Sequence, residues 1–514
     1  MLCVICTTAL RRARELAYTN TNPTIGHRHQ ETVGHHTSFA SFEASATTGC
    51  FACHRLWASI EAENRALLRD FDAAWAELRT RPGFYEEIGS EIPCEALDES
   101  INQVSSDWEY IPVVPSVAPV QEAPLGLDEY VCTENPLDGF VTTFQVWFFR
   151  GCDRIILEMG PSTGSEESLE RALAWVRNCT STHRDCNIET KAEQEWYPTR
   201  LLDVSAAPGM EGQGDIIRLV ITKENPPAKG DRYTTLSHCW GTAQFLQLTR
   251  SNLQSFQKGI KLEDLSKVFQ DAVAATRMLA VRYLWIDSLC ICQDKGDKSD
   301  WLAEAGLMAK VYSHSLCNLM ATGTSADAAG GLFSYRAPAI SVNTAILKAT
   351  DLGLKLRSRT GDIDDEDLVC CKIVDMNLLE EIDDSRLNKR GWVLQERVLA
   401  PRNLHFGRSE LLWECREHVA TESHPLVLPE EEEGSRNDDD MPNLKEAVAC
   451  VLQGRRLFKT QGIGPFEGYV VWLIVVAEYF PKGLTVATDK LVALSGIANQ
   501  FAARLGDEYI AAKK

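Results

Sequence analysis

The chain has 514 residues, 44% of them hydrophobic, so it has the composition of an ordinary globular protein and the length for two or three domains. Its 73 Asp and Glu outnumber 52 Lys and Arg, which gives a net charge of −21. Such a field repels phosphates and anionic lipids, so nucleic acid is not expected as a partner. The longest apolar run, residues 469–480, is shorter than the ~20 residues that a helix needs to cross a bilayer.

Cysteine usage indicates the cellular compartment. The 17 cysteines are an odd number, and the N-terminal sequence becomes basic almost at once instead of forming a secretory signal. We therefore expect free thiols rather than disulfides, in a cytoplasmic protein without a membrane span.

The first region, residues 1–109, is rich in Cys and His and contains a predicted helix over 56–79. It carries two Cys-x-x-Cys pairs. The two-residue spacer lets neighbouring thiolates bind one ion, so a structural zinc site is one interpretation. The alternative is a loosely ordered segment with four reduced cysteines. The candidate metal ligands are Cys3, Cys6, Cys50 and Cys53.

A linker and a lead-in segment are expected next. Residues 110–139 open with a stretch that has four prolines within 110–124, which resists helix and favours an extended connector. Residues 140–232 then read as an α/β segment, with strands over 140–149 and 154–160 and an amphipathic helix over 165–179.

From residue 216 strands and helices alternate at short spacing. This order predicts a parallel sheet flanked by helices on both faces, within a domain at 233–400. The predicted elements are strands at 216–221, 233–241, 282–287 and 316–322, a helix at 263–281, and a helix that carries Trp301, Ala305, Met308 and Tyr312 on one stripe.

Polar residues follow two of these strands directly. The sequence "SHCWG" ends the strand that begins at Tyr233, and Asp287 ends the buried run "RYLWID". In an open parallel sheet, ligands bind beyond the carboxyl ends of the strands. We therefore expect both loops to lie at one edge of the sheet.

Three long stretches resemble the fungal heterokaryon-incompatibility (HET) domain: "YTTLSHCWG" (233–241), "RYLWIDSLCICQDKGDKSDW" (282–301) and "RGWVLQERVLAPRNLHFGRSELLWEC" (390–415). Segments 179–204 and 484–498 resemble sequences that often flank that domain. The resemblance implies a Rossmann-like, remotely TIR-like fold in a protein of filamentous fungi. It also implies an effector of non-self recognition and programmed cell death, whose partners are other copies of the chain or allelic incompatibility proteins.

The C-terminal region departs from that resemblance. The chain ends at residue 514, whereas similar proteins usually continue further. We therefore expect 401–514 to be a mixed region of a truncated copy, with a helix at 485–504 that packs back on the domain. An inactive copy is one alternative.

Three chemistries are compatible with these residues. The first is a signalling and assembly module in which the motifs serve packing. The second, implied by the TIR likeness, is an NAD(P) nucleosidase-type hydrolase with NAD as substrate and Glu396 beside the nicotinamide ribose. The third is nucleophilic thiol chemistry by a Cys–His pair across the crevice, since His238 and Cys239 end one strand and Cys290 and Cys292 follow another. The sequence does not decide whether the protein is an enzyme.

The candidate site residues follow from the second alternative. Trp392 and Glu396 share one helical face at i and i+4, although Glu396 would be purely structural if it paired with Arg390 or Arg397. A hydrolase would bring Glu396, Asp287 and Ser237 to one solvent-accessible pocket. The catalytic candidates are Glu396 and Asp287, and the ligand-binding candidates are Ser237, His238, Trp240, Gly241, Asp294 and Trp392.

Overall fold

The structure is a computed structural model with two compact units, one made of residues 1–159 and 336–378 and the other of residues 160–335 and 379–514. It describes residues 33–34, 39–48, 110–111, 113–115, 129–135, 140–150, 159–187, 196–205, 215–241, 245–294, 296–324, 330–336, 344–348, 368–375, 378–423, 443–455, 466–484, 486 and 489–508. The predicted helix at 56–79 and most of the predicted strand at 154–160 lie outside these ranges.

The described part of the first unit is mainly an antiparallel sheet with strand order β12-β13-β5-β4-β3. Strands β2 to β4 lie in the segment for which the prolines predict a linker. A separate antiparallel pair joins β1 to β2. The elements are β1 (Val33–Gly34), α2 (Phe39–Thr47), β2 (Tyr110–Ile111), β3 (Val113–Pro115), β4 (Glu129–Asn135), β5 (Phe140–Arg150), β12 (Thr344–Lys348) and β13 (Leu368–Asp375).

The second unit is built on a nine-stranded sheet, within the described residues, in the order β16-β15-β14-β11-β8-β10-β6-β7-β9. Its strands are β6 (Arg200–Asp203), β7 (Ile216–Ile221), β8 (Tyr233–Ser237), β9 (Ile260–Lys261), β10 (Tyr283–Trp285), β11 (Cys317–Met320), β14 (Arg402–Phe406), β15 (Leu411–Cys415) and β16 (Val419–Thr421).

The centre of this sheet is parallel and its sides are antiparallel. The pairs β14–β11, β11–β8 and β8–β10 are parallel, whereas β6, β7, β15 and β16 join antiparallel. The central strands are buried on both faces, as parallel strands covered by helices must be. The predicted α/β class is confirmed, although the sheet is mixed rather than wholly parallel.

Alternation along β8 places helices on both faces of the sheet. The Tyr233 hydroxyl donates to the carbonyl of Val311 in α12 at 2.6 Å. The next residue, Thr234, contacts Thr276 of α9 through hydroxyl groups 2.8 Å apart. Because successive strand residues point to opposite faces, α9 (Lys267–Met278) and α12 (Met308–Ser313) lie on opposite faces of β8.

One predicted helix is two helices in the structure. The stripe from Trp301 to Tyr312 is divided between α11 (Ser299–Ala305) and α12, with a turn at Gly306 and Leu307. Apolar periodicity continues through the turn, so the pattern did not reveal the break. Glycine is a poor helix former, and the chain bends there.

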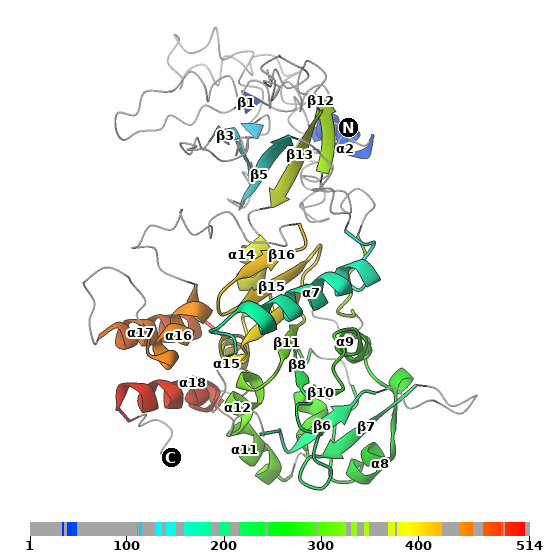
Figure 1. Ribbon diagram of the computed structural model, residues 1–514, viewed down its shortest axis with the longest axis vertical. Helices are drawn as coiled ribbons and strands as arrows, with labels where there is room; N and C mark the ends of the chain where they lie inside the picture. Colours follow the sequence, from blue (N-terminus) through cyan, green and yellow to red (C-terminus); the bar gives the residue numbers. More distant parts are fainter. Residues whose placement is uncertain are drawn as a thin grey trace, which may run out of the picture. The chain divides into compact units, whose positions relative to one another are not determined.

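The helices that Figure 1 shows next to α15 pack with it into a second hydrophobic cluster. Gly496 of α18 permits the close packing, since an added Cβ would lie 2.0 Å from the Gln395 side-chain oxygen of α15 and 2.6 Å from Ala309 of α12. The cluster is built from α15 (Gly391–Leu399), α16 (Leu444–Gln453), α17 (Glu467–Tyr479) and α18 (Lys490–Leu505).

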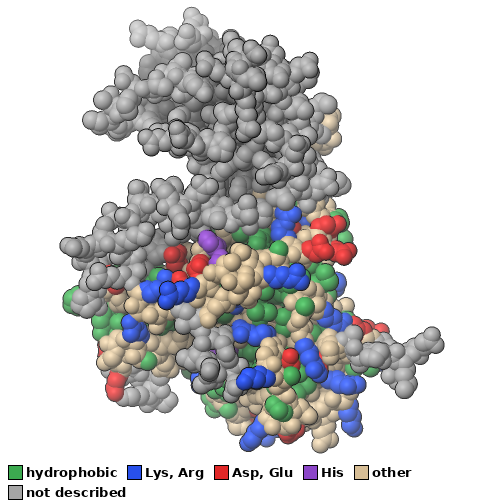
Figure 2. Space-filling view, in the orientation of Figure 1, with side chains coloured by type: hydrophobic (Ala, Val, Ile, Leu, Met, Phe, Trp, Pro, Cys, Tyr) green, Lys and Arg blue, Asp and Glu red, His purple; other side chains and the backbone are tan. Residues whose placement is uncertain are grey.

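The remaining helices complete the second unit. Helix α7 packs on β15 (Figure 1). Trp175 of α7 and Trp413 of β15 have ring centroids 6.2 Å apart. Acidic and basic side chains are interspersed over its described surface (Figure 2). None of the helices in the described ranges combines the length and apolar character required to span a bilayer. The helices of the second unit that remain to be listed are α7 (Glu166–Thr182), α8 (Leu253–Lys258), the 3-10 helix η2 (Leu262–Asp264), α10 (Asp287–Cys290) and α14 (Leu378–Asp384).

Candidate functional site

A buried serine and a buried glutamate meet at the carboxyl end of β8. Ser237 is the last residue of β8, and its hydroxyl donates a hydrogen bond to Oε2 of Glu396 in α15. Ser237 is four residues after Tyr233, and alternate residues of a strand point to the same face. Ser237 therefore lies on the face that α12 covers. Both side chains are buried.

Asn318 of β11 is the second polar partner of the Ser237 hydroxyl. Its Nδ2 donates to the Ser237 oxygen at 3.0 Å. Its Oδ1 accepts from the Thr235 hydroxyl at 2.9 Å and lies 3.2 Å from the Ser237 hydroxyl. A serine hydroxyl has a single hydrogen. Of its two acceptors, the Glu396 carboxyl is nearer than Asn318.

Burial makes the Glu396 carboxyl an unusually weak acid. Desolvation raises its pKa to about 7, against the opposing effects of the Arg390 charge and of hydrogen bonds from Ser237 and Tyr312. The charge of Asp287 raises the pKa further. A carboxyl group that titrates near neutral pH can serve as a general acid or base. The hydrolase alternative requires the ionised carboxylate, and at neutral pH Glu396 is divided between its ionised and protonated forms.

Of the two arginines that could pair with Glu396 in a purely structural role, only Arg390 acts on it. Arg397 does not pair with Glu396, because its guanidinium binds Glu414 at 2.9 Å and Asp383 at 2.7 Å. Arg390 acts on Glu396 through its charge, while its guanidinium donates to the backbone carbonyl of His238.

The opposite face of the β8 end holds a second polar group. Trp240 donates its indole N–H to Oδ2 of Asp287 at 2.8 Å, and Nδ1 of His238 lies 4.0 Å from Oδ1 of the same carboxylate. Asp287 begins α10 directly after β10, so the two loops meet at one sheet edge as predicted. Gly241 has φ +61°, a backbone conformation that favours glycine and turns the chain away after Trp240.

His238 is a buried, neutral ring. It packs edge-on against Phe245 and Phe269, with ring centroids 6.1 and 5.0 Å away. Among the described residues, its Nε2 has no hydrogen-bond partner. Burial lowers the pKa of His238 to about 4, although the Asp287 charge opposes the shift. The ring therefore remains uncharged at neutral pH.

Two ligand-binding candidates lie apart from these groups. Asp294 accepts the backbone N–H of Arg250 at 3.0 Å and so holds a loop. Trp392 packs edge-on against Trp301, with centroids 6.2 Å apart, between the two hydrophobic clusters. Their described contacts are structural. The predicted metal ligands Cys3, Cys6, Cys50 and Cys53 lie outside the described residues.

The contacts of the site cysteines give no support to thiol catalysis. Burial raises the pKa of Cys290 to about 12 and that of Cys292 to about 11, and it also raises the pKa of Cys239. The thiolate is the nucleophilic form of cysteine. These thiols therefore stay protonated at neutral pH, and the carboxyl group of Glu396 is the better candidate for chemistry.

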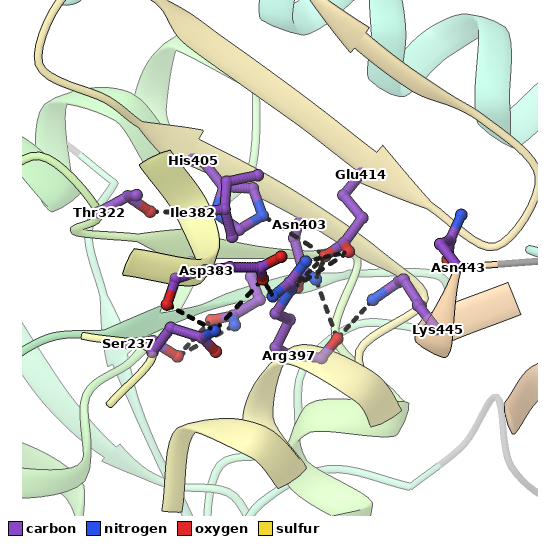
Figure 3. Close-up of polar contacts among 12 residues, drawn as sticks. Ser237, Thr322, Ile382, Asp383, Arg397, Asn403, His405, Glu414, Asn443 and Lys445 are labelled. Carbon is purple, nitrogen blue, oxygen red and sulfur yellow. Dashed lines mark hydrogen bonds and ion pairs between the residues drawn. The ribbon is translucent and has the colours of Figure 1, made fainter. Parts of the chain in front are cut away.

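Sequence reasoning missed a buried charge network next to this site, shown in Figure 3. Arg397 and Glu414 form its centre, and Asn403 donates to Glu414 at 2.7 Å. Lys445 donates to the backbone carbonyl of Arg397 at 2.5 Å, and His405 lies 3.5 Å from Glu414. The Arg397 charge helps to hold the pKa of Glu414 well below its usual range, against desolvation. No short motif marks these residues, since they come from four separate elements, α15, β14, β15 and α16.

A group of side chains able to hold a metal ion lies elsewhere in the second unit. Cys179, His183, Cys186 and Cys415 are all buried, and their ligand atoms lie within 4.8 Å of one another. Residues 179–186, "CTSTHRDC", belong to the segment 179–204 that resembles a sequence flanking the HET domain, and no metal was predicted there. The signal available was its Cys-x3-His-x2-Cys spacing.

Fold and site together define an α/β domain with a titratable carboxyl group buried at the edge of a parallel sheet core. Residues 233–396 match the family model described as Heterokaryon incompatibility protein (HET). Residues 233–396 are therefore a HET domain, which supports a role related to heterokaryon incompatibility. No curated protein and no solved structure matches the chain.

Proposed function

We propose that the protein is a cytoplasmic effector of fungal non-self recognition and programmed cell death, and that it acts by assembling with other copies or with allelic partners. The matched HET domain supports the incompatibility role. The surface of α17 supports assembly as the mode of action, and it is the observation on which this proposal rests.

Helix α17 is apolar apart from Glu467 in its first turn and Glu478 near its end. Its sequence, EGYVVWLIVVAEY, buries Val471, Val475 and Tyr479 against the neighbouring helices. On its other side Leu473 is 65% exposed, and Phe480, just after the helix, is 73% exposed. Hydrophobic side chains reach the surface at this end of the unit (Figure 2).

An exposed apolar helix face is a feature of interaction surfaces. Helices that are hydrophobic all round are normally buried, and apolar patches on the surface often mark protein contacts. The adjoining helix α18 adds Leu491, which is 50% exposed. The occupant that we propose for this face is a second copy of the chain, whose own α17 presents the same apolar side chains.

The test is the oligomeric state of the full-length protein, measured by light scattering over a range of concentrations. Wild-type protein should associate as the concentration rises, and Leu473→Glu should remain monomeric. Gln254→Glu on α8 adds the same charge to another exposed helix position and should associate like wild type. Wild-type protein that is monomeric at all concentrations, or association that Leu473→Glu leaves unchanged, would contradict self-assembly through α17.

A second candidate function is NAD(P) glycohydrolysis by a TIR-like mechanism, which the environment of Glu396 favours. Cleavage of the nicotinamide–ribose bond develops positive charge on the ribose, and a carboxylate beside it stabilises that charge. Glu396 has a pKa of about 7 and receives hydrogen bonds from Ser237 and Tyr312. The carboxylate form is thus populated at neutral pH and held in one orientation. Because the side chain is only 6% exposed, substrate entry requires movement around α15.

The assay is NAD consumption at protein concentrations that permit association. If Glu396 acts in catalysis, wild-type protein consumes NAD and Glu396→Gln loses the activity. Glu304→Gln is a matched control, since Glu304 of α11 is also buried and desolvation also raises its pKa. Loss of activity in both variants would point to a general structural effect, and no turnover by wild type would leave the assembly role alone.

A further inference from the structure

The four side chains of the Cys/His group come from two distant parts of the chain. Cys179 lies in the last turn of α7, His183 is the C-cap residue of that helix, and Cys186 follows in the next turn. Cys415 is the last residue of β15. The contact between Cys415 and His183 joins positions 232 residues apart. Such a meeting is a product of tertiary structure rather than of local sequence.

The distances suit one tetrahedral ion. A zinc ion with Zn–S near 2.3 Å and Zn–N near 2.05 Å separates two sulfurs by about 3.8 Å and a sulfur from a nitrogen by about 3.6 Å. The Cys415 sulfur lies 3.3 Å from Nδ1 of His183, and all four ligand atoms lie within 4.8 Å of one another. Small adjustments of side-chain torsions would therefore complete the coordination.

The surrounding groups match the charge of such a site. One Zn²⁺ with three thiolates and a neutral imidazole carries a net charge of about −1. Arg402, which is 1% exposed, donates from Nε to the Cys179 sulfur at 3.1 Å. The loaded site would thus be neutral overall, which removes the cost of a buried unpaired charge.

Backbone hydrogen bonds to the sulfurs add to this second shell. The backbone N–H of His418 donates to the Cys415 sulfur at 3.2 Å, in the turn between β15 and β16. The Arg416 backbone also hydrogen-bonds the Cys186 thiol. Partners of this kind orient metal ligands and stabilise thiolates. Cysteines that served only as small hydrophobic core residues would not need such hydrogen bonds to their sulfurs.

From this geometry we propose that Cys179, His183, Cys186 and Cys415 bind a structural zinc ion. Its ligand set, Cys₃His with no open position, is typical of structural rather than catalytic zinc. The ion would fasten the end of α7 to the β15–β16 hairpin, both of which lie outside the segment 233–396. The site is separate from Glu396, and the proposal is independent of the proposed function.

Polar contacts around Asp185 fix the same junction and show what the ion would reinforce. The Asp185 backbone N–H donates to the Glu417 carboxylate at 2.5 Å, and its carbonyl accepts from Gln453 of α16 at 2.9 Å. Arg455 pairs with the Asp185 carboxylate at 2.7 Å. Loss of the ion should therefore loosen α7, the hairpin and α16 together.

The test measures metal content of the full-length protein, purified under reducing conditions from zinc-supplemented cells, by inductively coupled plasma mass spectrometry. Cys415→Ser and Cys186→Ser should each contain one zinc ion per chain fewer than wild type. Cys450→Ser changes another buried free cysteine, on α16, and should keep the wild-type content. The difference between variants isolates this site from any zinc held by Cys3, Cys6, Cys50 and Cys53.

Two further measurements keep the proposal testable if a serine variant fails to fold. His183→Cys converts the ligand set to four thiolates and should retain zinc, whereas His183→Ala should lose it. Wild-type protein loaded with Co²⁺ should show the visible absorption of a tetrahedral thiolate site, and Cys415→Ser should lack that contribution. Equal zinc contents in wild type and Cys415→Ser, iron in place of zinc, or a disulfide among Cys179, Cys186 and Cys415 found by peptide mass spectrometry would overturn the assignment.

Discussion

Ser237 and Glu396 lie 159 residues apart in the chain and share a buried hydrogen bond at the end of β8. The two residues lie at either end of the segment that matches the HET family model. The bond ties the central strand to α15, which also packs on α18. Because it involves a carboxyl group whose pKa is about 7, it links the integrity of this junction to pH.

Glu396→Gln should change the dependence of stability on pH. Burial raises the pKa of Glu396 to about 7 from its ordinary value of 4.5, so the native state holds the proton more tightly than the unfolded chain does. The stability that this group contributes is complete below the unfolded pKa and declines as pH rises through the native one. Between pH 5.5 and 8.5 wild type should lose about 2 kcal/mol that the variant does not lose.

Chemical denaturation at several pH values measures this difference. Glu304→Gln provides the comparison, because Glu304 is a second buried carboxyl group and lies outside the site formed by Ser237 and Glu396. Parallel stability curves for wild type and Glu396→Gln would contradict the raised pKa.

Ser237→Ala should destabilise the protein by about 1–3 kcal/mol, because it leaves buried polar groups of Glu396 and Asn318 without one partner. It should also raise the pKa of Glu396 further, since the lost hydrogen bond favours the charged form. Urea unfolding curves give the first effect. Ser495→Ala, which removes an exposed hydroxyl that bonds only to its own helix, should change stability by less than about 0.5 kcal/mol. Equal effects of the two variants would show that the buried network is unimportant.

Arg397→Met should cost about 3–5 kcal/mol of stability, because it leaves Glu414 as an uncompensated buried charge. Adding Glu414→Leu should restore part of the loss, since a hydrophobic pair of similar volume avoids the desolvation cost. A double-mutant cycle from denaturation curves measures the coupling. Lys261→Ala, which breaks an exposed pair with Glu263, should have little effect. Additive losses for Arg397 and Glu414 would show that the pair is not coupled.

His238→Phe should remove a loss of stability in mild acid. Burial lowers the native pKa of His238 to about 4 from 6.5, so the unfolded chain takes up a proton before the native state does. Stability from this group is present above the unfolded pKa and is lost as pH falls toward the native one. From pH 7.5 to 5.5 wild type should lose about 1 kcal/mol that the variant keeps.

The same denaturation experiment distinguishes the two titrating groups by sign. The His238 effect grows as pH falls, whereas the Glu396 effect grows as pH rises. His314→Phe, at the half-buried C-cap position of α12, serves as the reference histidine variant. If His238→Phe has the same acid dependence as wild type, the buried ring is not the group that titrates.

Local sequence determined the elements of the central sheet. Bulky unalternating runs predicted the buried strands β10 and β11, and helical periodicity predicted α9. These patterns are readable because strand and helix periods are set by backbone geometry within a few residues. The polar residues after two strand ends also predicted one shared sheet edge, where Asp287 and Trp240 meet.

Only the tertiary structure decided which distant side chains meet. The sequence offered both Arg390 and Arg397 as partners of Glu396, and the fold directs Arg397 to Glu414 instead. It likewise brings Cys415 to His183, although nothing near Cys415 in the chain indicates a metal ligand. Such pairs depend on strand order and on which face of the sheet each helix covers. Local periodicity carries information about faces, whereas contacts across hundreds of residues are fixed only when the whole core packs.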